Sequence, residues 1–207
     1  MLVFEYWDTR VQRTKNALHQ ALFKLIEVQE YSEITIIDLT RVAGYSRGTF
    51  YAHYKHKDDL LDEIINLLFN KMITAYRSTY FDKKSINAQS FINEPYNLLK
   101  HFMEYGKYYQ LLLGNNFKID FRDKLTNKII NLTVEDFEIE SNEIDEEKVD
   151  DNLLMQYSAY GLAGLILDWV KEDFPISPEE FSKELAKTIQ YTLGTIKIKL
   201  PAKYSAK

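Results

Sequence analysis

The strongest constraint on the fold is a set of helix-boundary signals packed into residues 35–52, TIIDLTRVAGYSRGTFYA. Thr35 followed three residues later by Asp38 resembles a capping box, which begins a helix. Gly44 stands where that helix would end in a left-handed residue. Ser46 then caps a second, short helix that runs to about residue 52. Two helices joined by a tight turn that contains glycine form a helix-turn-helix unit.

The rest of the sequence is also helical in pattern. Apolar residues recur every three or four positions, and no stretch alternates polar and apolar residues as a half-buried strand does. Residues 134–151 hold ten carboxylates but lack the ligand spacing of a calcium loop, so we expect a loop that leads into a helix. We predict an all-α fold, with helices at about residues 9–26, 58–80, 95–113, 119–132, 153–170 and 178–196.

The N-terminal part of this acidic chain is basic. Up to residue 57 there are eight Lys and Arg against six Asp and Glu, whereas the whole chain has 26 against 31. No carboxylate occurs between Asp38 and Asp58, and residues 45–57 interleave Arg, Lys and His with Tyr. A basic segment on an acidic chain indicates an anionic partner for that segment alone, with a solvated basic surface as the alternative.

Several classes of protein are excluded or disfavoured by the composition. The absence of cysteine excludes disulfides, thiolate metal sites and cysteine nucleophiles. The longest apolar run, residues 159–167, is far shorter than the roughly 20 residues that cross a bilayer. With no signal-peptide pattern at the N-terminus, we expect a cytoplasmic protein that does not bind membranes.

Catalysis and metal binding have little support in the sequence. No nucleophile elbow or phosphate-binding loop is present, and there are only seven glycines, so we expect neither an enzyme nor a bound cofactor. His53 and His56 stand three residues apart, but no third ligand follows at helical spacing. We therefore expect no metal site.

Residues 10–61 resemble the DNA-binding segment of the TetR family of bacterial transcriptional regulators. The stretch TIIDLTRVAGYSRGTFYAHYKHKDDLL follows the family pattern in order and spacing, and YGLAGLILDWVKEDFPISPEEF resembles the C-terminal helices of one branch. Tyr45 departs from the small aliphatic residue usual at its position, and His56 from the Ser, Asn or Asp common at a helix start. The resemblance implies a three-helix helix-turn-helix DNA-binding domain in residues 1–56 and a helical ligand-binding and dimerisation domain in residues 57–207.

The resemblance also implies which residues contact double-stranded DNA. Arg47, Gly48 and Tyr51 fall on the N-terminal face of the recognition helix, which reaches base edges in the major groove. Arg47 can pair with guanine in bidentate fashion, and Gly48 permits close approach of the backbone. The other contacts are expected at phosphates, which fix register without reading sequence. The full expected set is Thr35, Ser46, Arg47, Gly48, Thr49, Tyr51, His53, Tyr54 and Lys57.

The resemblance implies a homodimer that recognises an inverted repeat and acts as a repressor under the control of a small apolar or aromatic effector bound by the C-terminal domain. The alternative is control by a protein partner that docks on the acidic domain. Aromatic side chains are candidates for an apolar ligand site, although most of them are expected in the core. These candidates are Tyr76, Tyr80, Phe102, Tyr105, Tyr109, Tyr157 and Tyr160.

The two C-terminal helices are expected to pair with their copies as a four-helix bundle. A nearly continuous apolar surface runs from Leu153 to Val170, and soluble monomers rarely expose such a surface. Small residues midway along this helix would let two helices approach closely. The expected interface residues are Ala159, Ala163, Gly164, Leu167, Leu185 and Ile189.

Overall fold

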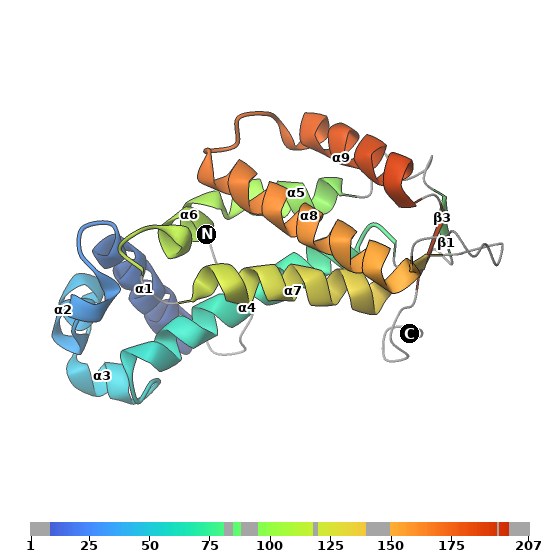
Figure 1. The fold of residues 1–207 in the computed structure, drawn as a ribbon. Helices are drawn as coiled ribbons and strands as arrows, with labels where there is room; N and C mark the ends of the chain where they lie inside the picture. Colours follow the sequence, from blue (N-terminus) through green and yellow to red (C-terminus); the bar gives the residue numbers. More distant parts are fainter. Residues whose placement is uncertain are drawn as a thin grey trace. The chain divides into compact units, whose positions relative to one another are not determined.

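The computed structural model describes residues 9–80, 85–87, 95–117, 120–139, 150–193 and 195–198 (Figure 1). Helices dominate these ranges, as predicted, and three short strands accompany them. The elements in chain order are α1 (Thr9–Ile26), the 3-10 helix η1 (Tyr31–Glu33), α2 (Ile36–Ala43), α3 (Arg47–Tyr51), α4 (Lys57–Arg77), β1 (Ser85–Asn87), α5 (Tyr96–Glu104), α6 (Gly106–Leu113), α7 (Phe121–Asp136), β2 (Phe137–Ile139), α8 (Asp151–Lys171), α9 (Pro178–Leu193) and β3 (Thr195–Ile198).

The helix boundaries around the turn lie where the capping signals predict them. Thr35 and Asp38 form the reciprocal capping box at the start of α2, and hydrogen bonds from Thr35 lower the pKa of the Asp38 carboxyl. Gly44 ends α2 with a φ of 74°, a left-handed conformation that glycine adopts without strain. The Ser46 hydroxyl accepts a hydrogen bond from the backbone N–H of Thr49 and caps α3.

Helix α4 begins without a Ser, Asn or Asp in the capping position, and Asp59, the third residue of the helix, forms the reciprocal half of a capping box. Its Oδ2 atom accepts hydrogen bonds from the backbone N–H groups of Lys55, at 2.8 Å, and His56, at 2.9 Å. These bonds lower the pKa of the Asp59 carboxyl. The Asp59 carboxylate therefore holds the two residues that lead into α4, and it does not replace the acceptor that Ser, Asn or Asp would supply at residue 56.

A small antiparallel sheet was not predicted from the sequence. Its strand order is β1-β3-β2, so the last strand of the chain pairs with segments from two distant regions. Ile196, which the apolar stripe of the last predicted helix includes, lies in β3 opposite Ile86 and Ile139. Strands of three or four residues are too short to show alternation, and their pairing is non-local.

The described chain forms two compact units. The first, called the head, comprises the described residues of Met1–Lys71 and Lys107–Asp120; the second, called the body, comprises those of Met72–Gly106 and Phe121–Lys207. Helix α4 begins in the head and ends in the body. From the sequence, a domain boundary is expected after residue 56. A domain is a part that folds independently, and a division by contacts does not test independent folding, so that boundary stays a prediction.

The head has a core that the N-terminal sequence does not complete by itself. Phe23 of α1 packs edge-on against Tyr108 of α6, with ring centroids 4.5 Å apart. Beyond α6, Asn116 donates its side-chain amide to the carbonyl of Ile26 and accepts the N–H of Tyr31 at its own carbonyl. Residues 107–117 therefore belong to the structural unit that carries α2 and α3.

The body is stabilised by a buried ion pair between the end of α4 and the end of α7. Arg77 donates two hydrogen bonds to Asp136, from Nε at 2.7 Å and from Nη2 at 2.8 Å. The Tyr80 hydroxyl donates to the same carboxylate at 2.6 Å, and Tyr76 pairs with Thr133 one turn earlier. Burial raises the pKa of both tyrosine hydroxyls, so they remain protonated donors.

We expect Arg77→Met to lower the free energy of unfolding by about 3–5 kcal/mol, because it leaves the fully buried Asp136 carboxylate without its cation. Lys187→Met is the matched control, since Lys187 forms an exposed pair with Glu184 within α9, and such pairs contribute at most about 1 kcal/mol. Urea unfolding at one protein concentration measures both. Equal losses for the two variants would contradict a structural role for the buried pair.

Candidate nucleic-acid interface

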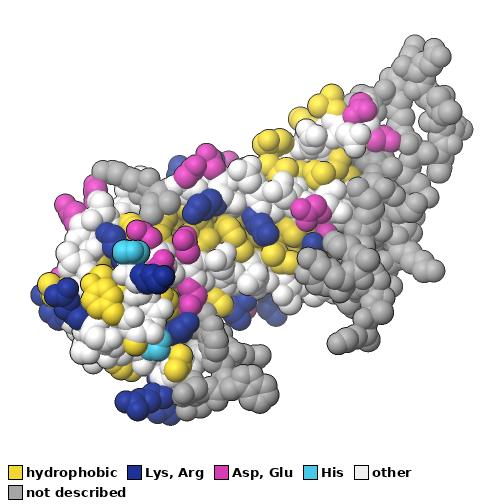
Figure 2. Space-filling model, turned by 90° about the horizontal axis from the view of Figure 1, so that it is seen from below, with side chains coloured by type: hydrophobic (Ala, Val, Ile, Leu, Met, Phe, Trp, Pro, Cys, Tyr) yellow, Lys and Arg dark blue, Asp and Glu magenta, His cyan; other side chains and the backbone are white. Residues whose placement is uncertain are grey.

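The short helix α3 divides its side chains sharply between core and solvent. Phe50 is completely buried, whereas Arg47, Gly48 and Tyr51 are exposed. Figure 2 shows Lys, Arg and His side chains gathered with exposed apolar side chains over the part of the head that carries α1–α3. This helix thus presents a cation, an open backbone position and an aromatic ring together, which suits the edge of a DNA groove.

The hydroxyl groups around α3 cap helices and also reach the surface. Thr35 donates its hydroxyl to Asp38 at 2.6 Å, and the hydroxyls of Ser46 and Thr49 lie 2.9 Å apart. Thr35 and Ser46 are exposed, while Thr49 and His53 are half-buried. A hydroxyl oxygen accepts and donates, so a capping role and a phosphate contact are compatible for these residues.

Lys57 lies at the start of α4, and its ammonium group is used within the head. Its Nζ donates to the carbonyls of Tyr31, Ser32 and Ile34 at 2.7, 3.1 and 2.9 Å, and lies 4.5 Å from the centre of the Tyr31 ring. Three hydrogen bonds occupy the full donor capacity of an ammonium. The phosphate contact implied for Lys57 stays a prediction, and it requires one of these bonds to be exchanged.

Tyr54 is also directed inward, into a polar cluster that the sequence did not reveal. The Tyr54 side chain is buried, and its hydroxyl donates to Glu63 Oε1 at 2.8 Å. Lys15 Nζ lies 2.7 Å from Glu63 Oε2, and His19 Nε2 lies 3.3 Å from Oε1. The only signal in the sequence is the presence of Lys15 and His19 four residues apart on α1. The phosphate contact implied for Tyr54 likewise stays a prediction.

The charges within this cluster follow from burial and hydrogen bonding. Burial disfavours the ionised Glu63 carboxyl, but hydrogen bonds from His19, Lys15 and Tyr54 outweigh it and lower its pKa to about 2. Burial lowers the pKa of His19 below its ordinary 6.5, against the opposing effect of Glu63. At neutral pH the cluster therefore holds one carboxylate, one ammonium and a neutral imidazole.

Two families of known sequences match this chain. "Bacterial regulatory proteins, tetR family" matches residues 18–64, and "Transcriptional regulator C-terminal region", of the TetR type, matches residues 87–191, about half of the chain. The chain belongs to the TetR family. TetR-family proteins are transcriptional regulators rather than enzymes, and their helix-turn-helix domains bind DNA, usually in dimers.

Individual relatives agree with this assignment. The chain is 46% identical over 59 residues to YxbF and 29% identical over 115 residues to YwcC, both uncharacterized HTH-type transcriptional regulators of Bacillus subtilis (strain 168). These matches cover 28% and 42% of this chain, and they span only 16% and 52% of the relatives' own lengths. Among solved structures, NalD of Pseudomonas aeruginosa, the secondary repressor of the MexAB-OprM multidrug efflux pump, shares the fold with a TM-score of 0.61 at 14% identity, over 90% of this chain and 98% of that one.

The aromatic candidates for an effector site in this TetR-family chain occupy different environments. Tyr76 and Tyr80 lie together, with ring centroids 5.5 Å apart, and both contact Phe137. Tyr76 also borders a narrow apolar gap, with Met72, Leu98, Ile129 and Leu132, that does not admit a water molecule. Phe102, Tyr105 and Tyr109 are buried, whereas Tyr157 and Tyr160 are exposed.

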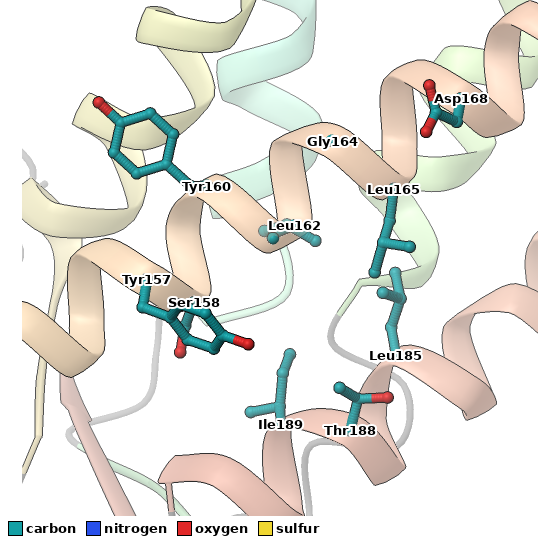
Figure 3. Close-up of a pocket in the computed structure, with 11 residues that line it drawn as sticks. Tyr157, Ser158, Tyr160, Leu162, Gly164, Leu165, Asp168, Leu185, Thr188 and Ile189 are labelled. Atoms are coloured by element: carbon teal, nitrogen blue, oxygen red, sulfur yellow. The ribbon is translucent and has the colours of Figure 1, made fainter.

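Helices α8 and α9 enclose an open apolar groove of about 460 Å³. Figure 3 shows Leu165 of α8 directed toward Leu185 of α9, while Tyr160 points away from α9. Of the expected interface residues, Gly164, Leu185 and Ile189 line this groove. Ala159, Ala163 and Leu167 are buried within the body of a single chain.

The exposed face of α8 carries apolar residues that the interface prediction omitted. Leu153 and Leu165 are exposed, and so are Tyr157 and Tyr160, which the sequence placed among the effector candidates. Leu153, Tyr157 and Tyr160 follow one another at spacings of four and three residues, which puts them on one side of the helix. Leu165 instead points toward α9 (Figure 3). This spacing was visible in the sequence, but α8 is apolar on almost every side, so periodicity could not distinguish its two faces.

The described ranges contain neither a cluster of metal ligands nor a membrane-spanning helix. There, no three His, Cys, Asp or Glu side chains gather closely enough to hold a metal ion. None of the described helices combines the length and apolar character that crossing a bilayer requires.

We expect Lys57→Met to lower the free energy of unfolding by about 1–3 kcal/mol, because three carbonyl groups lose their donor. Lys55→Met removes the same charge from an exposed side chain and should change stability by less than about 0.5 kcal/mol. Chemical denaturation of both variants measures the difference. Matching midpoints would show that the three hydrogen bonds of Lys57 do not stabilise the head.

Proposed function

We propose that this TetR-family regulator binds an inverted-repeat DNA operator as a homodimer and represses transcription until a small apolar or aromatic effector weakens binding. The observation that carries the proposal is the exposed side of α3. Arg47, Gly48 and Tyr51 face solvent there, whereas Phe50 of the same helix is buried in the head. A dimer with two-fold symmetry places two such helices in successive major grooves, which requires an inverted repeat. A dimer bound over a promoter would exclude RNA polymerase.

The proposed base contact is the guanidinium of Arg47, supported by phosphate contacts from the surrounding residues. Arg47 is exposed at the first residue of α3, so its side chain is free to extend from the helix N-terminus. The capped turn on either side holds this end of the helix in place through Gly44 and Ser46. We propose Thr35, Ser46, Thr49 and His53 as the phosphate contacts, with Tyr54 and Lys57 holding the head together behind them.

We expect Arg47→Ala to weaken operator binding by about 1–3 kcal/mol per half-site and to relax preference at one or two base pairs. Arg122→Ala is the matched control, since it removes the same charge from an exposed position on α7. Titrations compare a duplex enriched from a random library with a scrambled duplex at several salt concentrations. Unchanged sequence preference in Arg47→Ala would remove Arg47 from base recognition, and a wild type that binds no duplex at low salt would refute the proposed function.

The proposed dimer interface is the exposed side of α8 together with the groove that it forms with α9. Tyr157 and Tyr160 are 70% and 58% exposed, and Leu153 extends the same apolar surface, while Leu165 lines the groove. Gly161 and Gly164 lie on this side, and apart from the adjoining residues and the backbone of α8 itself, no heavy atom lies within 4 Å of the position that a Cβ would occupy at either residue. A second copy of α8 can therefore approach closely here, as the small residues led us to expect, but on the side of the helix opposite Ala159 and Ala163.

We expect Tyr157→Lys to convert the dimer into monomers, because it places a charge in the apolar interface. Val28→Lys is the matched control: Val28 is 76% exposed, and it lies in the head, outside the proposed interface. Light scattering at micromolar concentration should give about twice the chain mass of 24.5 kDa for the wild type and the control. A wild type with the mass of one chain would refute the dimer.

The proposed effector site lies in the body beside Tyr76, at the apolar gap between α4, α5 and α7. Because this gap does not admit water, an effector would have to separate the helices that line it, and that displacement would act on α4. The alternative, control by a protein partner, is supported by the exposed apolar side of α8. The proposed dimer covers this side of α8, so the surface is not available to a partner protein. Control by a small effector is therefore the better-supported proposal.

A further inference from the structure

We infer that Glu63 is a positioning residue for DNA recognition: through Tyr54 it fixes the orientation of α3 without contacting DNA itself. The inference rests on the proposed function of α3 and adds a residue to it that belongs to α4. Glu63 joins two segments of the head: Lys15 and His19 of α1, and Tyr54 just after α3. The Tyr54 hydroxyl also lies 3.4 Å from His19 Nε2, so Glu63 and His19 together define its position. Its carboxylate accepts hydrogen bonds from all three.

The connection between Glu63 and α3 is short. Helix α3 has only five residues, so its orientation depends on the few side chains that it and the following turn bury. These are Phe50 and Tyr54, whose ring centroids lie 5.6 Å apart, and the backbone N–H of Tyr54 donates to the carbonyl of Phe50. A displacement of the Tyr54 ring therefore moves the last turn of α3, which carries the exposed Tyr51.

The donors from α1 hold the carboxylate in place for Tyr54. Lys15 Nζ bonds Oε2 at 2.7 Å, whereas Tyr54 and His19 share Oε1 at 2.8 and 3.3 Å. With one oxygen fixed by the ammonium, the other is left in a single position to receive the tyrosine hydroxyl. Hydrogen bonds to an ionised acceptor are shorter and stronger than neutral ones, so this arrangement specifies the ring position better than an amide would.

A positioning residue of this kind predicts a particular pattern of binding. Base contacts depend on the angle at which α3 enters the groove, whereas non-specific binding depends mainly on the number of phosphates neutralised. Loss of the Glu63–Tyr54 bond should therefore reduce affinity for the selected duplex and leave affinity for a scrambled duplex unchanged. The slope of log affinity against log salt should also be unchanged, because no cation is lost.

The test uses Glu63→Gln, which keeps an acceptor oxygen but removes the charge, and Tyr54→Phe, which removes only the hydroxyl. Each variant of the full-length chain is titrated with the enriched and the scrambled duplex, and its thermal unfolding is recorded. We expect the ratio of the two affinities to fall about tenfold in both variants, at a temperature well below unfolding, as is typical for a lost bond to a charged group. The double variant should lose less than the sum of the two single variants, because both substitutions weaken the same Glu63–Tyr54 bond.

Glu33→Gln is the control for charge, since Glu33 is exposed in η1 and the substitution changes the net charge by the same amount. It should leave the affinity ratio as in the wild type. A folded Tyr54→Phe variant with an unchanged ratio would overturn the inference, and it decides the matter even if Glu63→Gln does not fold. Failure of the wild type itself to distinguish the two duplexes would instead refute the proposed function.

Discussion

Helix α4 is one uninterrupted element that contributes to both compact units, and each unit fixes its own part of that helix with a carboxylate network. Near the start, Glu63 of α4 accepts donors from α1 and from the turn after α3. At the end, Arg77 of α4 donates to the buried Asp136 of α7, which also accepts the hydroxyl of Tyr80. Apolar packing alone is tolerant of small rotations, whereas these hydrogen-bonded groups have definite directions. They therefore set the rotation of α4 about its own axis in each unit.

The residues of the recognition segment fall into two groups with different physical roles. One group faces solvent and is available to DNA. The other faces the core and determines the position and orientation of the exposed residues. Tyr54 and Lys57 belong to the second group, because their polar atoms are bonded to Glu63 and to three backbone carbonyls. Family resemblance assigns residues to positions in a motif, but only the surrounding structure decides toward which side a flexible or aromatic side chain is directed.

Local signals in the sequence predicted the helix-turn-helix accurately, and non-local features escaped prediction. The capping residues Thr35 and Ser46 and the left-handed Gly44 each act on neighbours within four residues, so sequence spacing is sufficient to place them. The Glu63 cluster joins residues up to 48 positions apart, and the sheet joins three distant segments. Burial of Ala159 against exposure of Tyr157 depends on how α8 is rotated within the body, which an almost uniformly apolar helix does not encode in its periodicity.

The separation of buried and exposed residues in α3 has a consequence for how such a regulator can change the DNA sequence that it recognises. Phe50, the buried residue of the helix, carries the packing, and the hydrogen bonds that hold the following turn come from other segments. Arg47 is exposed and adds little to this framework, whereas the Tyr51 ring packs edge-on against Phe50, so exchanges at position 51 cost less when the new residue is aromatic. Under the proposed base contacts, a lineage of duplicated genes, or a laboratory library restricted to these exposed positions, can therefore explore new operators while every member inherits the same scaffold.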